Sequence, residues 1–214
     1  MLHQYFLLRR HLAAFVITAA IAAPAFAEEP NGASSTAAAA EAAVRIDNFG
    51  RINERYYRGA LPDAQDLADL ARLGVKTTID LTNGDGDSRE QELAEAAGMK
   101  FVKIAMSTRV VPTAEQIATF LSIVNDPANQ PVYVHCVGGK HRTGLMTAIY
   151  RMVQDSWTPD RAFTEMKTYK FGADFLHPEF KKFVHAFTPS PFAFPLMPPT
   201  PVKQPGAPSS SPER

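Results

Sequence analysis

Cysteine is nearly absent from this sequence, because Cys136 is the only one among 214 residues. A single thiol has no partner within the chain, which excludes an intramolecular disulfide framework. Excess charge of either sign is absent too, since 22 Lys and Arg balance 22 Asp and Glu. General nucleic-acid binding and lipid-surface binding both depend on a basic surface, so we expect no nucleic-acid partner.

A hydrophobic run long enough to span a bilayer comfortably is also missing. The apolar stretch LAAFVITAAIAAP occupies residues 12–24, whereas a spanning helix needs about 20 apolar residues. Arg9 and Arg10 precede it, and AFA at residues 25–27 places small side chains where a signal peptidase cleaves. We therefore expect residues 1–27 to be a signal peptide, with an uncleaved anchor helix as the alternative. Cleavage would leave a periplasmic or secreted chain with no stable membrane span.

Composition divides the remainder into three parts. Residues 28–43 are small and polar without an apolar period, which predicts a flexible linker. Residues 188–214 are rich in proline and end in a serine-rich stretch, which predicts a disordered tail. One folded domain is therefore expected over residues 44–187, and we expect it to be a monomer.

Helical and extended patterns alternate through this domain. β-Branched or apolar runs predict strands over residues 55–59, 75–81, 100–104 and 131–135. Cap residues predict helices that begin near Asp63, Ser88, Thr113, Arg142, Thr158 and Pro178. Strands separated by capped helices indicate an α/β domain with a central, largely parallel sheet flanked by helices. Ligands bind at the carboxyl ends of such strands, and the last predicted strand delivers Cys136 there.

The segment CVGGKHR, residues 136–142, joins that strand to the next predicted helix. Gly138 and Gly139 allow a short loop to turn its backbone N–H groups inward around a tetrahedral oxyanion. The helix that begins at Arg142 adds the positive end of its dipole, and the guanidinium fork of Arg142 can bind two phosphate oxygens. A phosphate site is therefore predicted, formed by Val137, Gly138, Gly139, Lys140, His141 and Arg142.

The same features would activate the thiol of Cys136. A free cysteine has a pKa of about 8.5, and a helix N-terminus with nearby cations lowers it to roughly 3.5–7.5. The loop that binds phosphate would thus also create the nucleophile that attacks it. The hydroxyl of Thr143 can reach back to the thiolate and stabilise it as a leaving group. His135 is expected to orient the loop by hydrogen bonding from the end of the strand.

The stretch HCVGGKHRTG resembles the signature loop of the protein tyrosine phosphatase superfamily, the cysteine-dependent phosphatases that include dual-specificity members. The stretch from Asn48 to RGALPD also resembles the opening of the plant and fungal atypical dual-specificity phosphatases, here in an exported form. The similarity covers roughly residues 48–170. This resemblance implies a phosphocysteine intermediate on Cys136, phosphate binding by Arg142, and hydrolysis that needs no metal or cofactor. Some members of that branch act on inositol pyrophosphates.

The general acid is the part of the family pattern that this sequence does not plainly supply. These phosphatases usually place an Asp on a separate loop to protonate the leaving oxygen. The corresponding segment IAMSTRVVPTAEQI, residues 104–117, contains no Asp. Glu115 in that segment and Asp87, with Asp85, in the turn NGDGDS are the candidates. Each has a simpler interpretation, Glu115 as a helix-start residue and the two Asp as turn residues.

The sequence therefore predicts a phosphatase that hydrolyses phosphomonoesters through Cys136, acting on phosphotyrosine or dual-specificity protein substrates, or on inositol phosphates. Lys140 and His141 add positive charge at the rim of the site. This charge suits either a substrate with several anionic groups or a single phosphate. The uncertain acid leaves one alternative, a phosphate-binding pseudo-phosphatase with little catalysis. The phosphorylated substrate is the only partner that we expect.

Overall fold

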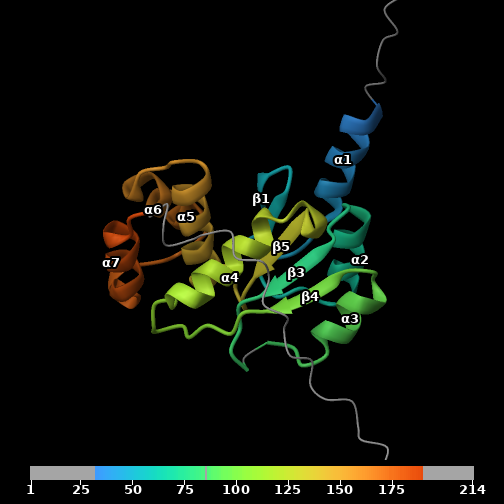
Figure 1. The fold of residues 1–214 in the computed structure, drawn as a ribbon. Coiled ribbons are helices and arrows are strands. Elements are labelled where there is room, and N and C mark those ends of the chain that lie inside the picture. Colours follow the sequence, from blue (N-terminus) through green and yellow to red (C-terminus); the bar gives the residue numbers. More distant parts are fainter. Residues whose placement is uncertain (1–31, 85, 190–214) are drawn as a thin grey trace, which may run out of the picture.

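A five-stranded sheet in the order β1-β2-β5-β3-β4 forms the centre of the molecule (Figure 1). The computed structural model describes residues 32–84 and 86–189. β1 pairs antiparallel with β2, and the other three pairings are parallel, which confirms the predicted largely parallel sheet. The strands are β1 (Gly50–Asn53), β2 (Tyr56–Gly59), β3 (Thr77–Asp80), β4 (Lys100–Lys103) and β5 (Val132–His135).

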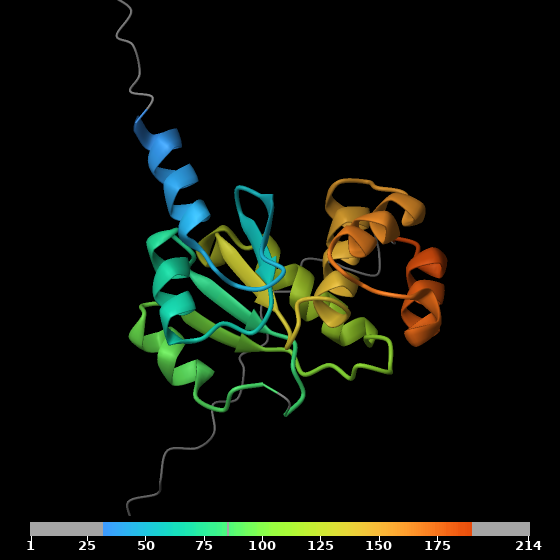
Figure 2. The same ribbon diagram turned by 180° about the vertical axis from the view of Figure 1, so that it is seen from behind.

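Helices cover both faces of this sheet, as Figures 1 and 2 show. One face carries α2 and α3, whose apolar side chains pack with Tyr57 and Tyr133 of the central strands. The opposite face carries α4 and α5, and α6 and α7 pack against α5. The helices are α1 (Gly32–Ala43), α2 (Ala64–Arg72), α3 (Glu90–Ala96), α4 (Ala114–Asn125), α5 (Arg142–Gln154), α6 (Pro159–Thr168) and α7 (Pro178–Ala186).

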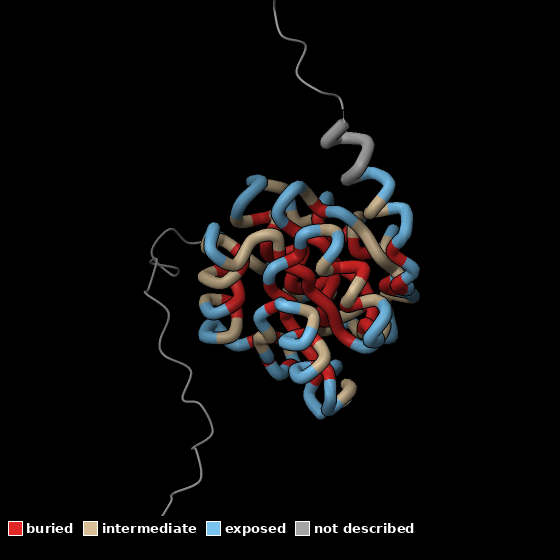
Figure 3. Tube along the Cα trace, turned by 90° about the vertical axis from the view of Figure 1, so that its right-hand side faces the viewer, coloured by how far each residue is buried: buried red, intermediate tan, exposed pale blue. Residues whose placement is uncertain are grey.

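Burial is greatest along the middle of the sheet. Every residue of β2, β3 and β5 is buried, and buried chain fills the centre of the molecule in Figure 3. The carboxyl end of β5 is therefore a fixed platform, because packing on both faces and pairing on both edges leave it little freedom. The segment after His135 starts from this platform.

Side-chain caps set the beginnings of several helices, as the sequence predicts. Asp63 caps α2 and Thr113 caps α4, each in a capping box with the residue three positions later. Thr158 caps α6. Ser88 with Gln91 also has the sequence pattern of a capping box, but this prediction is wrong, because α3 begins after Arg89 without a side-chain cap. The Asp87 carboxylate instead accepts the Arg89 N–H at 2.8 Å and closes the preceding turn.

Two elements were not predicted from the sequence. α1 lies where we expected an unstructured linker over residues 28–43, because alanine, its main residue, is the best helix former. β1 is short and mostly polar, and only Ile52 of its four residues is buried, so it has no apolar pattern. The predicted signal peptide, residues 28–31 and residues 190–214 lie outside the described residues. None of the described helices is long and apolar enough to cross a membrane.

Candidate active site

The loop between β5 and α5 forms the wall of a pocket of about 380 Å³ at the carboxyl edge of the sheet. This is the position that the sequence predicts for the site. Its lining contains five of the six predicted phosphate-binding residues, Val137, Gly138, Lys140, His141 and Arg142, together with Cys136 and Thr108. Gly139 and Thr143 do not line the pocket, and both are buried next to it.

The thiol of Cys136 is buried, with 3% of the residue exposed, yet its surroundings favour the thiolate. Burial alone would raise the pKa of Cys136, but hydrogen bonds from the Thr143 side chain and N–H, the Arg142 charge and the Lys140 N–H lower it below its usual value. The Thr143 hydroxyl is buried and no other described group accepts a hydrogen bond from it, so it is available to donate to the sulfur. The thiol is therefore poised to act as a nucleophile.

Arg142 begins α5 and is held at the sheet edge by backbone carbonyls. Its Nη1 donates to the Leu81 carbonyl at 3.4 Å and to the Met106 carbonyl at 3.3 Å. These bonds fix the guanidinium beside the thiol, where its charge acts on Cys136. No Asp or Glu of the described chain lines the pocket, so its lining attracts anions.

His141 differs from the expectation that it adds positive charge. Its Nε2 lies 3.0 Å from the Phe171 carbonyl, and its ring centroid lies 3.9 Å from that of His177, at the start of α7. Burial and the neighbouring His177 lower the pKa of His141 below its usual value of 6.5. The imidazole is therefore neutral at pH 7. Its visible role is to join the loop to the segment between α6 and α7.

The structure does not bring either general-acid candidate to the pocket. Glu115 is exposed in the first turn of α4. Asp87 accepts hydrogen bonds from the backbone and side chain of Arg89, which hold its pKa below the usual range. A carboxyl with a lowered pKa is ionised at neutral pH and has no proton to donate. Asp85 lies outside the described residues.

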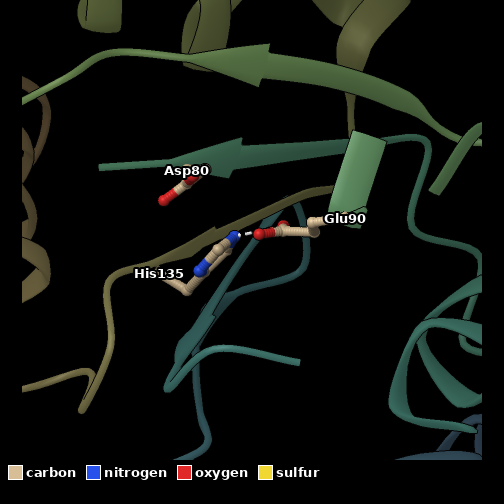
Figure 4. Close-up of side chains that lie close together, drawn as sticks. All are labelled: Asp80, Glu90 and His135. Carbon is tan, nitrogen blue, oxygen red and sulfur yellow. Dashed lines mark ion pairs between the residues drawn. The ribbon is translucent and has the colours of Figure 1, made fainter. Parts of the chain in front are cut away.

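A buried polar cluster behind the loop is the group of described side chains that could hold a metal. Ligand atoms of Asp80, Glu90 and His135 all lie within 4.8 Å of one another (Figure 4). Asp80 already has a cation, because the Lys103 Nζ lies 2.6 Å from its Oδ2. Burial alone would raise the pKa of Asp80, but Lys103, His135 and Thr82 hold it below its usual range. An internal ion-pair network describes this cluster better than a metal site.

His135 belongs to this cluster rather than to the loop. Its Nε2 lies 2.7 Å from Oε1 of Glu90, and both side chains are completely buried. We expected His135 to orient the loop through a hydrogen bond, but its imidazole instead lies beside Glu90. Glu90 of α3 fixes the imidazole at the strand end, and the strand in turn places the next residue, Cys136.

Three residues near the site were missed from the sequence. Thr108 lines the pocket from the segment in which we searched only for an acid. Asn48 and Arg58 both donate to the carbonyl of Gly139 on the far side of the loop. Both lie in the stretch that resembles the family opening, but nothing in their residue type or spacing indicates a contact with a loop about 80 to 90 residues later.

Comparison with known proteins places this site in a family context. Residues 40–184 match the family model described as "DSP-PTPase phosphatase fused to NAD+ Kinase". The dual specificity protein phosphatase TpbA of Pseudomonas aeruginosa is 32% identical over 165 residues, which cover 77% of this chain and 73% of that protein. The inositol diphosphatase SIW14 of Saccharomyces cerevisiae is 28% identical over 130 residues, which cover 58% of this chain and 46% of the yeast protein.

Solved structures of the same two proteins share the fold. The core catalytic domain of the yeast SIW14 phosphatase aligns with a TM-score of 0.59 at 26% identity, covering 67% of this chain and 87% of that one. TpbA of P. aeruginosa aligns with a TM-score of 0.57 at 28% identity, covering 66% of this chain and 86% of that one.

Proposed function

We propose a function from one premise: this chain belongs to the DSP-PTPase phosphatase family, whose model matches residues 40–184. The chain is a cysteine-dependent phosphatase that hydrolyses phosphomonoesters, as its similarity to TpbA and SIW14 indicates.

The reaction proceeds in two displacements at phosphorus. In the first, the Cys136 thiolate attacks the phosphorus of the substrate. A sulfur–phosphorus bond forms, the bond from phosphorus to the leaving oxygen breaks, and a phosphocysteine results. In the second, water attacks this intermediate, the sulfur–phosphorus bond breaks, and inorganic phosphate and the thiolate are released. The leaving oxygen takes up one proton and the attacking water gives one up, so the cycle balances.

The other loop residues stabilise charge during these steps. The guanidinium of Arg142 and the N–H groups of residues 137–142 bind the phosphoryl oxygens, which carry the negative charge of the transition state. The Thr143 hydroxyl donates to the sulfur and stabilises it as the leaving group of the second step. Lys140 supplies a further positive charge at the rim of the pocket.

One observation supports catalysis over phosphate binding alone. The only thiol of the chain lines a pocket with Lys140 and Arg142, and the Thr143 hydroxyl and three other groups lower its pKa. A binding module needs the N–H groups and the cations but gains nothing from a stabilised thiolate. A pseudo-phosphatase that only binds phosphate would therefore have no function for the lowered pKa of Cys136.

The first candidate substrate is a phosphorylated protein, with phosphotyrosine among its targets. TpbA, which matches 77% of this chain, is a dual specificity protein phosphatase, and a variant of it has been crystallised with pTyr. An inositol diphosphate is the second candidate, since SIW14 is an inositol diphosphatase. One observation favours it: no described carboxyl lines the pocket, and a phosphoanhydride leaving group needs little protonation.

Hydrolysis of p-nitrophenyl phosphate by the full chain and by its Cys136→Ser variant tests the proposed mechanism. We expect the variant to lose at least about 10³-fold in kcat, because the nucleophile is gone. Acid quenching during turnover should trap phosphate on Cys136. Equal rates for the two proteins would refute the mechanism. Circular dichroism of the variant serves as the folding control.

The substrate is tested by ranking kcat/KM over a phosphotyrosyl peptide, a phosphothreonyl peptide and an inositol diphosphate. A comparison of p-nitrophenyl phosphate with phenyl phosphate adds the effect of the leaving group. A steep loss with phenyl phosphate would show that no acid protonates the leaving oxygen, which would favour the inositol diphosphate candidate. Similar rates for the two esters would favour a protein substrate and an acid that reaches the pocket.

We also propose that the chain works in the periplasm or outside the cell. The support is the charged, apolar and small-residue pattern of residues 1–27, which are outside the described structure. Cell fractionation followed by N-terminal sequencing tests this. We expect an exported chain that begins at Glu28, and an intact chain in the cytoplasmic fraction would contradict the proposal.

A further inference from the structure

The outer side of the phosphate-binding loop rests on a distant part of the chain, which we call the N-terminal segment (residues 48–61). Three consecutive carbonyls of the loop accept hydrogen bonds from it. The Leu61 N–H donates to the Val137 carbonyl at 3.1 Å. The Asn48 side chain donates to the Gly139 carbonyl at 2.8 Å and lies 3.4 Å from the Gly138 carbonyl. All three carbonyls thus point away from the pocket.

Asn48 is shaped for this contact in two ways. Its backbone lies in the left-handed region, with φ at 57°, which Asn tolerates better than most residues. Its Nδ2 donates to the carbonyls of both Gly139 and Tyr169, at 2.8 and 2.9 Å. Both neighbours are acceptors only, so the NH₂ end of the side chain must face them. Asn48 therefore ties the loop to the end of α6.

Arg58 provides the second hold on the same carbonyl. This side chain is completely buried in β2, and its Nη2 donates to the Gly139 carbonyl. Its guanidinium carbon lies 4.0 Å from the ring centroid of Tyr169, a cation–π contact. Burial lowers the pKa of Arg58, and the nearby Cys136 is among the groups that raise it.

The geometry of the peptide between Gly139 and Lys140 connects the hydrogen bonds on the Gly139 carbonyl to the reacting thiol. The Gly139 carbonyl and the Lys140 N–H belong to one planar trans peptide and point in opposite directions. A carbonyl held outward therefore turns the N–H inward, and the Lys140 N–H is among the groups that lower the pKa of Cys136. Gly139 also sits so close to β2 that a Cβ there would collide with the backbone of Gly59.

We propose that Asn48 and Arg58 are positioning residues: by holding the Gly139 carbonyl against the N-terminal segment, they keep the Lys140 N–H turned toward the sulfur and the phosphoryl oxygens. The inference rests on the proposed function, because it gives these residues a role in that reaction. A purely structural role, in which they only attach the N-terminal segment to the core, predicts lower stability without a change at the thiol.

Asn48→Asp and Asn48→Gly separate these two roles. Asp keeps the size of the side chain and its tolerance of positive φ but replaces both N–H donors with an acceptor. Gly removes the side chain and accepts the backbone angle without strain. The matched control is Asn53→Asp, because Asn53 lies in the same N-terminal segment and donates to the Tyr150 hydroxyl at 2.9 Å, away from the loop.

Arg58→Lys tests the second hold, since it keeps the charge but loses the planar fork and the stacking on Tyr169. Its matched control is Arg151→Lys. Arg151 also stacks on an aromatic ring, with its guanidinium carbon 4.3 Å from the Trp157 centroid, and its ion pairs are with Glu165 and Asp155, away from the loop.

The readout is alkylation of the full chain by iodoacetamide as a function of pH, with and without inorganic phosphate. Cys136 is the only cysteine, so the rate reports this thiol alone and needs no turnover. We expect both Asn48 variants and Arg58→Lys to raise the midpoint of the pH profile of alkylation by about one pH unit. At a pH below the midpoint this is a tenfold loss of the thiolate form. Protection by phosphate should weaken by a similar factor, and kcat/KM should fall at least tenfold.

The outcomes distinguish this inference from the proposed function. Hydrolysis that survives Cys136→Ser would refute the proposed function, while the alkylation profiles would still test positioning. The positioning role would be overturned if variants with native circular dichroism have the same alkylation midpoint as the controls and a protection by phosphate within twofold of theirs. If one variant fails to fold, the others decide. Failure of all three to fold while both controls fold would show a structural role only and would also overturn it.

Discussion

Gly139→Ala should damage the site through the backbone of a strand that lies outside the pocket. Gly139 has φ of 63°, in the left-handed region, where a residue with a Cβ pays about 1–2 kcal/mol. The added Cβ would also collide with the carbonyl of Gly59 and approach the Ala60 nitrogen. Gly59 ends the buried strand β2 and Ala60 follows it, and the atoms in contact are backbone atoms, which cannot move aside as the end of a flexible side chain could. The loop must shift instead.

The size of the effect of Gly139→Ala follows from the left-handed backbone at this residue and from the collision of the added Cβ with Gly59. A shift of about 1 Å in catalytic groups costs about 10²-fold in rate, equivalent to ~2.7 kcal/mol in the activation free energy. We therefore expect Gly139→Ala to lose at least about 100-fold in kcat/KM. The free energy of unfolding should fall by about 2–4 kcal/mol, from the left-handed backbone and the displaced loop together.

Gly98→Ala is the matched control. Gly98 also has a positive φ, 80°, but a Cβ there would meet nothing within 4 Å, so only the conformational cost applies. Urea unfolding and p-nitrophenyl phosphate kinetics on both variants measure the two costs separately. If Gly139→Ala is no less stable than Gly98→Ala and keeps kcat/KM within threefold of the unaltered chain, the loop is not packed on β2 as described.

Three further predictions use other parts of the structure. Thr143→Val keeps the shape of the side chain but removes the hydroxyl that lowers the pKa of Cys136; the alkylation midpoint should rise and phosphocysteine should accumulate in acid-quench experiments, whereas an unchanged midpoint would contradict the hydrogen bond. Asp87→Asn and Glu115→Gln should leave kcat within twofold, because neither residue lines the pocket, and a tenfold loss in either would identify it as the acid. Lys103→Met leaves the buried Asp80 carboxylate without its cation and should lower the free energy of unfolding at pH 7 by about 2 kcal/mol, less than for a fully buried pair because Lys103 is partly exposed. Since the pKa of Asp80 is lowered in the folded state, its contribution is present above the unfolded pKa and is lost as the pH falls through the folded value; urea unfolding of the unaltered chain should show this loss below pH 4, and Lys103→Met should show less of it.

The chemistry of the loop could be predicted because it is local. Cys136, the two glycines and Arg142 lie within seven consecutive residues, and a strand before them with a helix after them is enough to bring them together. The same holds for the capping boxes at Asp63 and Thr113, where the partner is three residues away. Short-range geometry of this kind depends on backbone dihedrals more than on packing.

The errors in the prediction have other causes. α1 was assigned to a linker because small residues show no apolar period, although alanine favours a helix for intrinsic reasons. The charge of His141 depends on His177, which reaches it only after α6 and the following turn bring the chain back. The distance of Asp87 and Glu115 from the pocket depends in the same way on how α3 and α4 pack.

The sequence by itself determined the α/β pattern, the position of the thiol at the carboxyl edge of the sheet, and the set of groups that surround an oxyanion there. Only the tertiary structure decided how that set is held. The supports of Gly139 come from Asn48 and Arg58, 91 and 81 residues earlier in the chain. An Asn or an Arg carries no local mark of such a contact, because a carbonyl so far along the chain becomes its acceptor only when β2 and β5 pair and the loop closes over them.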